Sequence, residues 1–170
     1  RVIPPTDGRI IVKGHVEPMI ELGVGFNPEL SGRENIMLNA AIHGRDPKVV
    51  KERIDDLIEW AGLQEVVDLP LRTYSSGMVA RLGFAVATDI NPDIVLVDEV
   101  LAVGDIDFMA KSRARMEKIM GEGSTVVLVS HDLETVRTLA TRAIWMEHGK
   151  IRAEGNPSDV IDAYIKDAHH

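Results

Sequence analysis

Two acidic residues that follow an apolar run are the first candidates for chemistry in this sequence. Asp98 and Glu99 stand side by side after the apolar residues 94–97. Near the end of a strand, where the chain begins to turn, two neighbouring carboxylates can serve different tasks at one site. One can hold a hydrated Mg²⁺ ion, because hard cations prefer carboxylate oxygens, and the other can orient or deprotonate a water molecule. Taken alone, the pair is also typical of the solvated acids with which many strands end.

A histidine after a second apolar run adds to this pair. His131 lies just beyond residues 125–129, and a single histidine in such a place is more often a surface residue than a catalytic one. If the two runs are neighbouring strands of one parallel sheet, their carboxyl ends meet at one edge, where ligands of such sheets bind. We therefore expect His131 to lie near Asp98 and Glu99. The three residues together are stronger evidence for a functional site than any one of them alone.

A group of small residues forms a third candidate site. Ser75, Ser76 and Gly77 come directly before an apolar segment that we expect to be helical. Backbone N–H groups and the helix dipole at such a start can bind an anion. On these residues alone, an ordinary helix cap accounts for the pattern equally well.

The elements that must position these residues alternate between strands and helices. Residues 94–97, bounded by acids, and residues 125–129 form apolar runs, a pattern typical of strands buried on both faces. A turn at Gly149 favours a β-hairpin over residues 143–153. The alternation predicts an α/β fold with a mainly parallel sheet. Helices are expected over residues 31–43, 46–61, 78–90, 107–120, 132–140 and 156–165.

Local signals fix several of these boundaries. Ser31 and Glu34 have the spacing of a capping box. The next helix has apolar residues at helical spacing between positions 50 and 61, which predicts one face turned to an internal core. Short strands are expected at residues 9–13 and 16–22, and Pro18 places the second at a sheet edge.

Composition limits the function classes. The 170 residues carry 19 Lys and Arg against 27 Asp and Glu, a net charge of −8, which argues against a nucleic-acid or membrane-surface binder. The absence of cysteine excludes disulfides, thiolate zinc sites and cysteine nucleophiles. Aromatic residues make up 4%, too few for a base-stacking platform. Apolar runs stay well short of the roughly 18 residues of a membrane span.

Taken together, the motifs resemble those of the ABC-transporter nucleotide-binding domain, a P-loop NTPase-like α/β fold. The order of four motifs fits this family over about residues 8–165. Residues 74–78 (Tyr-Ser-Ser-Gly-Met) are similar to its signature loop, and residues 94–99 to Walker B with the catalytic glutamate. Residues 102–105 are similar to the D-loop, and residues 129–132 to the switch-histidine loop.

The resemblance implies roles in the hydrolysis of ATP with Mg²⁺. Asp98 would hold Mg²⁺ through water, and Glu99 would polarise the attacking water. His131 would contact the γ-phosphate. Asp105 would signal across a dimer of two ATP-binding subunits.

The signature loop would serve the partner subunit. In the family each ATP site is built from the P-loop of one subunit and the signature loop of the other. Ser75 and Gly77 would contact the γ-phosphate of an ATP held by the opposite subunit, with Ser76 between them.

The same resemblance divides residues 1–170 into three parts of a partial ABC ATPase domain. Residues 1–30 would hold an antiparallel β region and the Q-loop. Residues 31–90 would form a helical subdomain that ends in the signature loop and its helix. Residues 91–170 would form the catalytic core.

Two departures from the family pattern stand out. The P-loop pattern Gly-x-x-x-x-Gly-Lys-Ser/Thr is absent, and the only Gly-Lys pair is Gly149-Lys150, within the expected hairpin. We therefore expect the sequence, which opens on Arg1, to be N-terminally truncated, and the 170-residue chain alone to bind ATP weakly without turnover. The Q-loop region has no Gln, and either Glu21 or Asn27 would take that role.

The Tyr-Ser-Ser-Gly-Met form of the signature loop, together with residues 25–35, resembles a narrower group within the family. This group is the ATP-binding subunits that export O-antigen, capsule or teichoic acid in bacteria. This implies a homodimer at the cytoplasmic face of the inner membrane, with a transmembrane permease as partner and as its sole link to the membrane. The alternatives are a soluble ABC ATPase acting on nucleic acid or ribosomes, which the net charge of −8 disfavours, and a non-enzymatic fragment.

Overall fold

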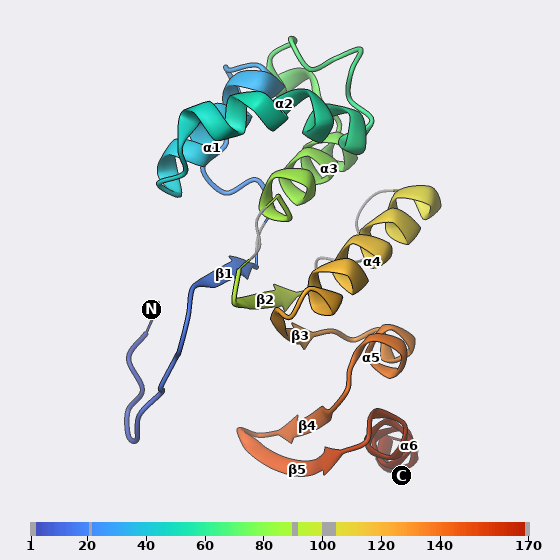
Figure 1. The fold of residues 1–170 in the computed structure, drawn as a ribbon. Helices are drawn as coiled ribbons and strands as arrows, with labels where there is room; N and C mark the ends of the chain where they lie inside the picture. The colour runs from blue at the N-terminus through green and yellow to red at the C-terminus, as the bar shows by residue number, and fades with distance from the viewer. Residues whose placement is uncertain (1–2, 21, 90–91, 100–104, 169–170) are drawn as a thin grey trace.

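The protein is described by a computed structural model that covers residues 3–20, 22–89, 92–99 and 105–168. A parallel sheet has the strand order β1-β2-β3, and β4 and β5 form a separate antiparallel pair. Helices α1 to α3 gather at one end of the molecule, whereas the β4–β5 hairpin and α6 lie at the other (Figure 1). The strands are β1 (Val16–Met19), β2 (Ile94–Asp98), β3 (Thr125–Val129), β4 (Ala143–Glu147) and β5 (Lys150–Gly155). The α-helices are α1 (Gly32–Ile42), α2 (Pro47–Ala61), α3 (Ser76–Ala87), α4 (Ile106–Gly121), α5 (Leu133–Leu139) and α6 (Pro157–Ala168), with a 3-10 turn at Leu71–Thr73.

The helical end forms around its own apolar core. The capping box predicted at the start of α1 is present, with the Ser31 and Glu34 side chains each bonded to the backbone of the other residue. The apolar face of α2 is buried as predicted and packs with residues of α1 and α3. This core contains Ile36, Ala40, Val50, Ile54, Leu57, Ile58, Ala61, Leu63, Val67, Leu71, Leu82, Ala85 and Val86.

A second core lies on one face of the parallel sheet. Val95 and Val97 of β2 are buried against α3 and α4, together with Met19, Phe84, Phe108, Met116 and Ile119. Trp60 packs against both cores, and its ring lies 5.8 Å from that of Phe84 and 5.2 Å from that of Phe108. The aromatic contacts therefore join the helical end to the sheet.

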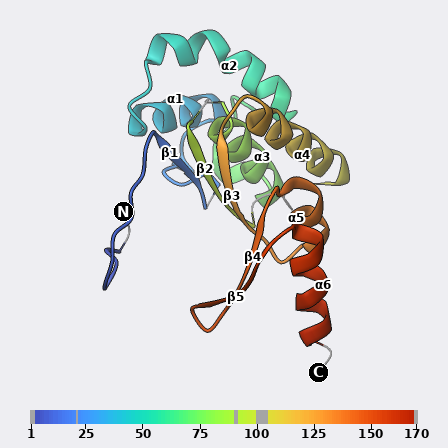
Figure 2. The same ribbon diagram turned by 60° about the horizontal axis from the view of Figure 1, so that its bottom comes forward.

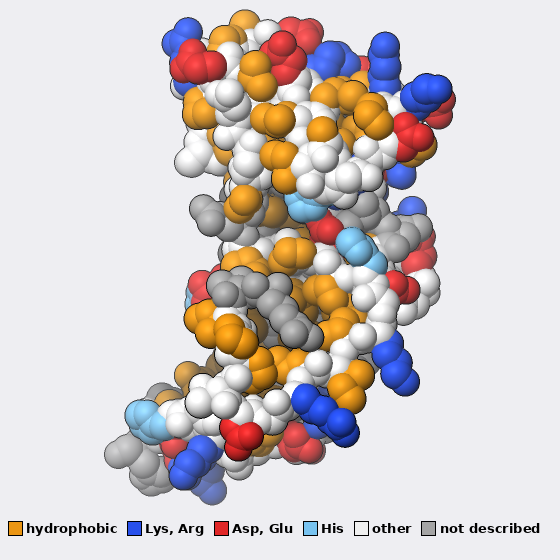
Figure 3. Space-filling view, turned by 90° about the vertical axis from the view of Figure 1, so that its left-hand side faces the viewer, with side chains coloured by type: hydrophobic (Ala, Val, Ile, Leu, Met, Phe, Trp, Pro, Cys, Tyr) orange, Lys and Arg blue, Asp and Glu red, His pale blue; other side chains and the backbone are white. Residues whose placement is uncertain are grey.

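The prediction that residues 125–129 are buried on both faces is wrong for the described residues. Val126 and Leu128 of β3 pack on the core side, but Val127 and Val129 on the other face are 51% and 58% exposed. An apolar run indicates that a strand is apolar on both faces, but it does not show that other elements pack on both faces. Viewed from the side, apolar side chains remain exposed over the middle and lower parts of the molecule (Figure 3).

The pairing of β1 also corrects an expectation. Residues 1–30 were expected to hold an antiparallel β region, but β1 runs parallel to β2, with Val16 opposite Ile94 and Met19 opposite Val97. The chain leaves β1, forms α1 to α3 and then enters β2, and such a helical crossover returns the next strand in the same direction. Residues 9–13, expected as a strand, are exposed and form no strand.

The antiparallel region lies instead at the other end of the molecule. β4 and β5 pair as predicted, and His148 and Gly149 between them both have positive φ, 48° and 76°, as a two-residue hairpin turn requires. The Gly149-Lys150 pair thus joins the hairpin turn to the start of β5. Helix α6 lies beside the hairpin (Figure 2). The Tyr164 ring meets the Trp145 ring edge-on at this contact. Among the described residues, no helix is long and apolar enough to cross a membrane.

A close approach of α3 to the loop after β1 gives a test of this packing. A Cβ atom at Gly83 would lie 2.7 Å from the backbone nitrogen of Gly23 and 3.1 Å from the carbonyl carbon of Leu22. We expect Gly83→Ala to lower the free energy of unfolding by about 2 kcal/mol, since overpacking outweighs the gain in helix propensity.

Gly121→Ala is the matched control, because a Cβ at this end of α4 meets no atom within 4 Å. Denaturant unfolding of both variants measures the difference. Equal stabilities would show that the loop moves aside and that the contact imposes no constraint.

Candidate functional site

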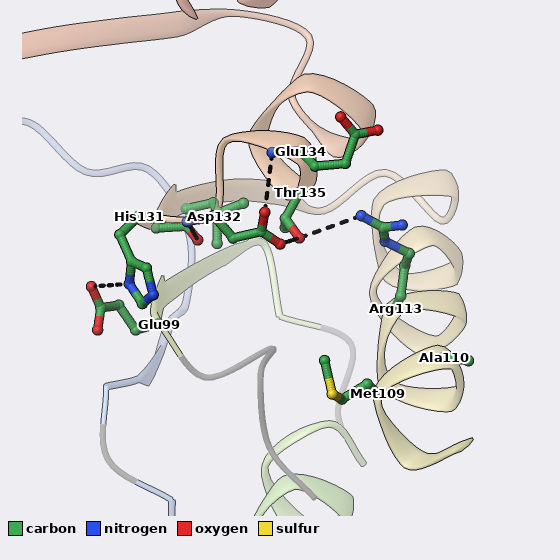
Figure 4. Close-up of a pocket in the computed structure, with 10 residues that line it drawn as sticks. Glu99, Met109, Ala110, Arg113, His131, Asp132, Glu134 and Thr135 are labelled. Atoms are coloured by element: carbon green, nitrogen blue, oxygen red, sulfur yellow. Dashed lines mark hydrogen bonds and ion pairs between the residues drawn. The ribbon is translucent and has the colours of Figure 1, made fainter. Parts of the chain in front are cut away.

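The structure brings Glu99 and His131 together at the carboxyl ends of two neighbouring strands. β2 and β3 are parallel, with Asp98 opposite Val129, and the Glu99 N–H donates to the Val129 carbonyl at 2.9 Å. Beyond this last rung, His131 Nδ1 lies 2.9 Å from Glu99 Oε1 (Figure 4). The structure therefore places His131 next to Glu99, as predicted.

Glu99 occupies a backbone conformation that the sequence does not reveal. Its φ is 55°, in the left-handed region that non-glycine residues rarely adopt. The chain thus leaves the strand geometry at Glu99, and the simple alternation of side chains along β2 ends there. Residues in this region often mark functional sites, because the surrounding structure must hold a conformation that costs about 1–3 kcal/mol.

The charge on Glu99 acts on the histidine. The hydrogen bond to Glu99, together with the attraction of its charge, raises the pKa of His131 above its ordinary value. Both side chains are accessible, 56% for Glu99 and 78% for His131, so water weakens the pairing. The pair is ready to hold or pass a proton, and it is open to a ligand.

Asp98 ends β2 and is exposed. Among the described residues there is no group of three or more His, Asp or Glu side chains that could enclose a metal ion. Mg²⁺ does not need such a cage of side chains. This ion usually keeps several waters and is held by one or two carboxylates together with substrate phosphates. The donor set thus suits a hydrated Mg²⁺ that comes with a phosphate ligand.

The signature-like residues lie elsewhere. Ser75 caps α3, and its Oγ accepts from the Met78 N–H at 3.2 Å. The helix begins at Ser76, two residues earlier than predicted, and Gly77 is in its first turn. Because the chain reaches β2 only from the other end of α3, these residues are separated from Glu99 and His131 by a helix about 18 Å long (Figure 1).

Asp105 caps α4, since its Oδ1 accepts from the Phe108 N–H at 2.8 Å. The helix was expected over residues 107–120, and the structure begins it at Ile106, one residue earlier. The remaining D-loop residues, 102–104, and Glu21 lie outside the described residues. Asn27, the other Q-loop candidate, precedes α1. Its backbone N–H and carbonyl both form hydrogen bonds with the side-chain amide of Asn35 in α1.

A pocket of about 260 Å³ adjoins the pair and holds residues that the sequence did not single out. It lies between β3, α4 and α5, and Arg113 and Thr135 line it beside Glu99 and His131. Asp132 caps α5 as predicted, and its carboxylate accepts from the Thr135 hydroxyl, which lowers the pKa of Asp132. The Asp132–Thr135 spacing is a capping signal, but nothing in the sequence pointed to Arg113 on another helix.

In open α/β sheets, ligands bind beyond the carboxyl ends of the strands, which is where the two acids and the histidine lie in this structure. Comparison with known proteins agrees. Residues 4–102 match the family model described as "ABC transporter". The chain belongs to the ABC transporter family.

Two curated relatives are similar over nearly the whole chain. The O-antigen export system ATP-binding protein RfbB of Klebsiella pneumoniae is 45% identical over 163 residues, 96% of this chain and 66% of that protein. The teichoic acids export ATP-binding protein TagH of Lactococcus lactis is 43% identical over 164 residues, 96% of this chain and 35% of that protein. The chain thus spans less than two thirds of the length of these relatives.

Solved structures confirm the fold. An ATP-binding subunit of an ABC transporter superposes with a TM-score of 0.75 at 20% identity, covering 88% of this chain and 62% of that one. An ATP-binding cassette solved as a dimer in a post-hydrolysis state, with ADP and Pi, gives a TM-score of 0.68 at 23% identity, covering 84% and 63%. The ABC ATPase fold predicted from the motifs is confirmed.

The His131–Glu99 pair predicts a pH dependence with a definite sign. Because the pKa of His131 is raised in the folded chain, the pair stabilises the fold fully below the unfolded pKa of about 6.5. This contribution is lost as the pH rises through the raised pKa. An NMR titration of the imidazole should show His131 titrating above the ordinary value, and Glu99→Gln should return it toward that value.

Glu134→Gln is the control, since this carboxylate lines the same pocket without bonding to His131. If Glu99→Gln and Glu134→Gln moved the His131 titration equally, the pairing would not be the cause of the raised pKa.

Proposed function

We propose that this chain is part of the ATP-binding and ATP-hydrolysing subunit of a bacterial ABC exporter for a polysaccharide of the O-antigen or teichoic-acid kind. The similarity of 45% over 96% of the chain to an O-antigen export ATP-binding protein carries this proposal. The Glu99–His131 pair beside Asp98 supports it, because these residues supply the chemistry that hydrolysis needs at one sheet edge.

In the proposed hydrolysis, Glu99 is the group that orients and polarises the attacking water. A carboxylate can accept a proton from that water as it attacks. His131 contacts the γ-phosphate, and its raised pKa favours the charged imidazolium that an anionic phosphate attracts. Asp98 is the residue that would hold a hydrated Mg²⁺, which would supply positive charge beside the phosphates when bound.

The second subunit of a homodimer completes each site. Ser75, Ser76 and Gly77 contact the ATP of the opposite subunit, which suits their exposed position at the start of α3 and their distance from Glu99 in the same chain. Asp105, at the start of α4, communicates across the dimer. In this arrangement the start of α3 binds phosphate. The signature loop and the Glu99–His131 pair of one ATP site then come from different subunits.

The parts of the chain then have separate tasks. Residues 1–30 contain the Q-loop, residues 31–90 form the helical subdomain that presents the signature loop, and residues 91–170 form the catalytic core. The permease is the proposed membrane partner, and the subunit lies at the cytoplasmic face of the inner membrane. The net charge of −8 supports a function without nucleic acid.

Glu99→Gln tests the catalytic assignment in the native subunit that carries these residues. The amide keeps the size of the side chain but cannot accept a proton, so we expect steady-state ATP hydrolysis to fall by about 100-fold or more. ATP binding should be retained and the closed dimer should accumulate. Nucleotide binding, ATPase rate and size-exclusion chromatography with ATP measure these outcomes.

His131→Ala should likewise reduce turnover while the chain stays folded. Glu122→Gln, at the exposed far end of α4, is the matched control and should hydrolyse at the native rate. Hydrolysis at the native rate by Glu99→Gln would refute the role of Glu99. Polysaccharide export in cells that carry only the Glu99→Gln subunit would contradict the proposed coupling to transport.

A further inference from the structure

Arg113 joins two helices that flank the proposed hydrolysis site. It lies near the middle of α4, and its Nη2 donates to the hydroxyl of Thr138 at 2.9 Å and to that of Thr135 at 3.3 Å. Both threonines belong to α5, the helix that follows the switch histidine. Among the described residues, hydrogen bonds between side chains of α4 and α5 come from Arg113 alone.

Thr135 passes this contact on to the residue next to His131. Its hydroxyl donates to the Asp132 carboxylate while accepting from Arg113 (Figure 4). Asp132 also accepts from the Glu134 N–H at 3.1 Å, and its own N–H donates to the Ser130 hydroxyl at 3.0 Å. His131 therefore stands between two residues whose positions are fixed by hydrogen bonds.

The opposite side of α4 is tied to the helical subdomain. Lys111 donates to the Trp60 carbonyl at 2.9 Å, and Arg115 donates to the Thr88 carbonyl at 3.1 Å. Phe108 packs edge-on against the Trp60 ring. One helix thus contacts the switch region on one side and the part of the chain that carries the signature loop on the other.

We propose that Arg113 is a positioning residue for ATP hydrolysis, which holds His131 in place through Thr135 and Asp132 and ties the switch region to α4. The proposal rests on the proposed function. Arg113 does not touch the reacting atoms; it sets the geometry of the residue that does. An arginine suits this task, because Nη2 of the guanidinium carries two N–H groups and can donate to both threonine hydroxyls at once.

The chain offers a matched pair of arginines for the test. Arg113→Met removes the donors and keeps the length of the side chain. Arg137→Met is the control, because Arg137 also anchors α5, through a 2.7 Å ion pair with Asp162 of α6, but does not bond to Thr135 or Asp132. Each variant is made in the native subunit that carries these residues.

We expect Arg113→Met to lower kcat for ATP by about tenfold or more while KM for ATP stays within about twofold, because small displacements of a catalytic group are costly. Arg137→Met should retain the native kcat. Arg113→Lys, which keeps a cationic donor, should recover part of the loss. Thr135→Val should resemble Arg113→Met, and the double variant should be no slower than the slower single variant, because both act through one path.

The outcomes separate this proposal from the proposed function. If Arg113→Met and Arg137→Met have the same kcat, or if the effects of Arg113→Met and Thr135→Val multiply, the positioning role is refuted. A loss of kcat that follows a loss of folded protein, measured by thermal unfolding, would reduce Arg113 to a structural residue. If Glu99→Gln hydrolyses ATP at the native rate, the proposed function itself fails, whatever Arg113 does.

Discussion

The parallel pairing of β2 with β3 is the constraint on which the rest of the site depends. Asp98 lies opposite Val129, and the following hydrogen bond from Glu99 closes the ladder. Only this register brings the side chains of Glu99 and His131, 32 positions apart in the sequence, to within 2.9 Å. A slip of one residue would exchange Val126 and Leu128 for Val127 and Val129 on the core side of β3 and separate the pair.

The two apolar cores explain how one chain can carry two distant functional regions. One core holds α1 to α3 together, the other holds α3 and α4 on the sheet, and Trp60 contacts both. Helix α3 contributes residues to both cores, and its start carries Ser75 away from the sheet while its end leads back to β2. Lys111 and Arg115 lie within 5.4 and 5.6 Å of the Trp60 ring and add attraction at this junction. The separation of the signature loop from Glu99 thus follows from packing.

The sequence predicted most elements, because their signals are local. Ser31 with Glu34 marks a helix start through bonds within one turn, and the residues between positions 50 and 61 reveal a helix face through their spacing. The proximity of His131 to Glu99 was also predictable, since parallel strands end at the same edge. The exposure of Val127 and the direction of β1 were not, because each depends on which distant segment lies alongside. The role of Arg113 was not predicted for the same reason, because its hydrogen-bond partners are 22 and 25 positions away in the sequence.

The openness of the Glu99–His131 pair bears on how hydrolysis would be controlled. In water an exposed pair of this kind interacts weakly, because the high dielectric constant of the solvent screens its charges. The pair gains strength when a covering surface excludes water, because electrostatic interactions grow as the surrounding dielectric constant falls. In the proposed dimer that surface comes with the signature loop of the opposite subunit and the phosphates it binds. Closure of the dimer would then do more than complete the ATP site, since it would also strengthen the Glu99–His131 pair and so favour hydrolysis in the assembled state.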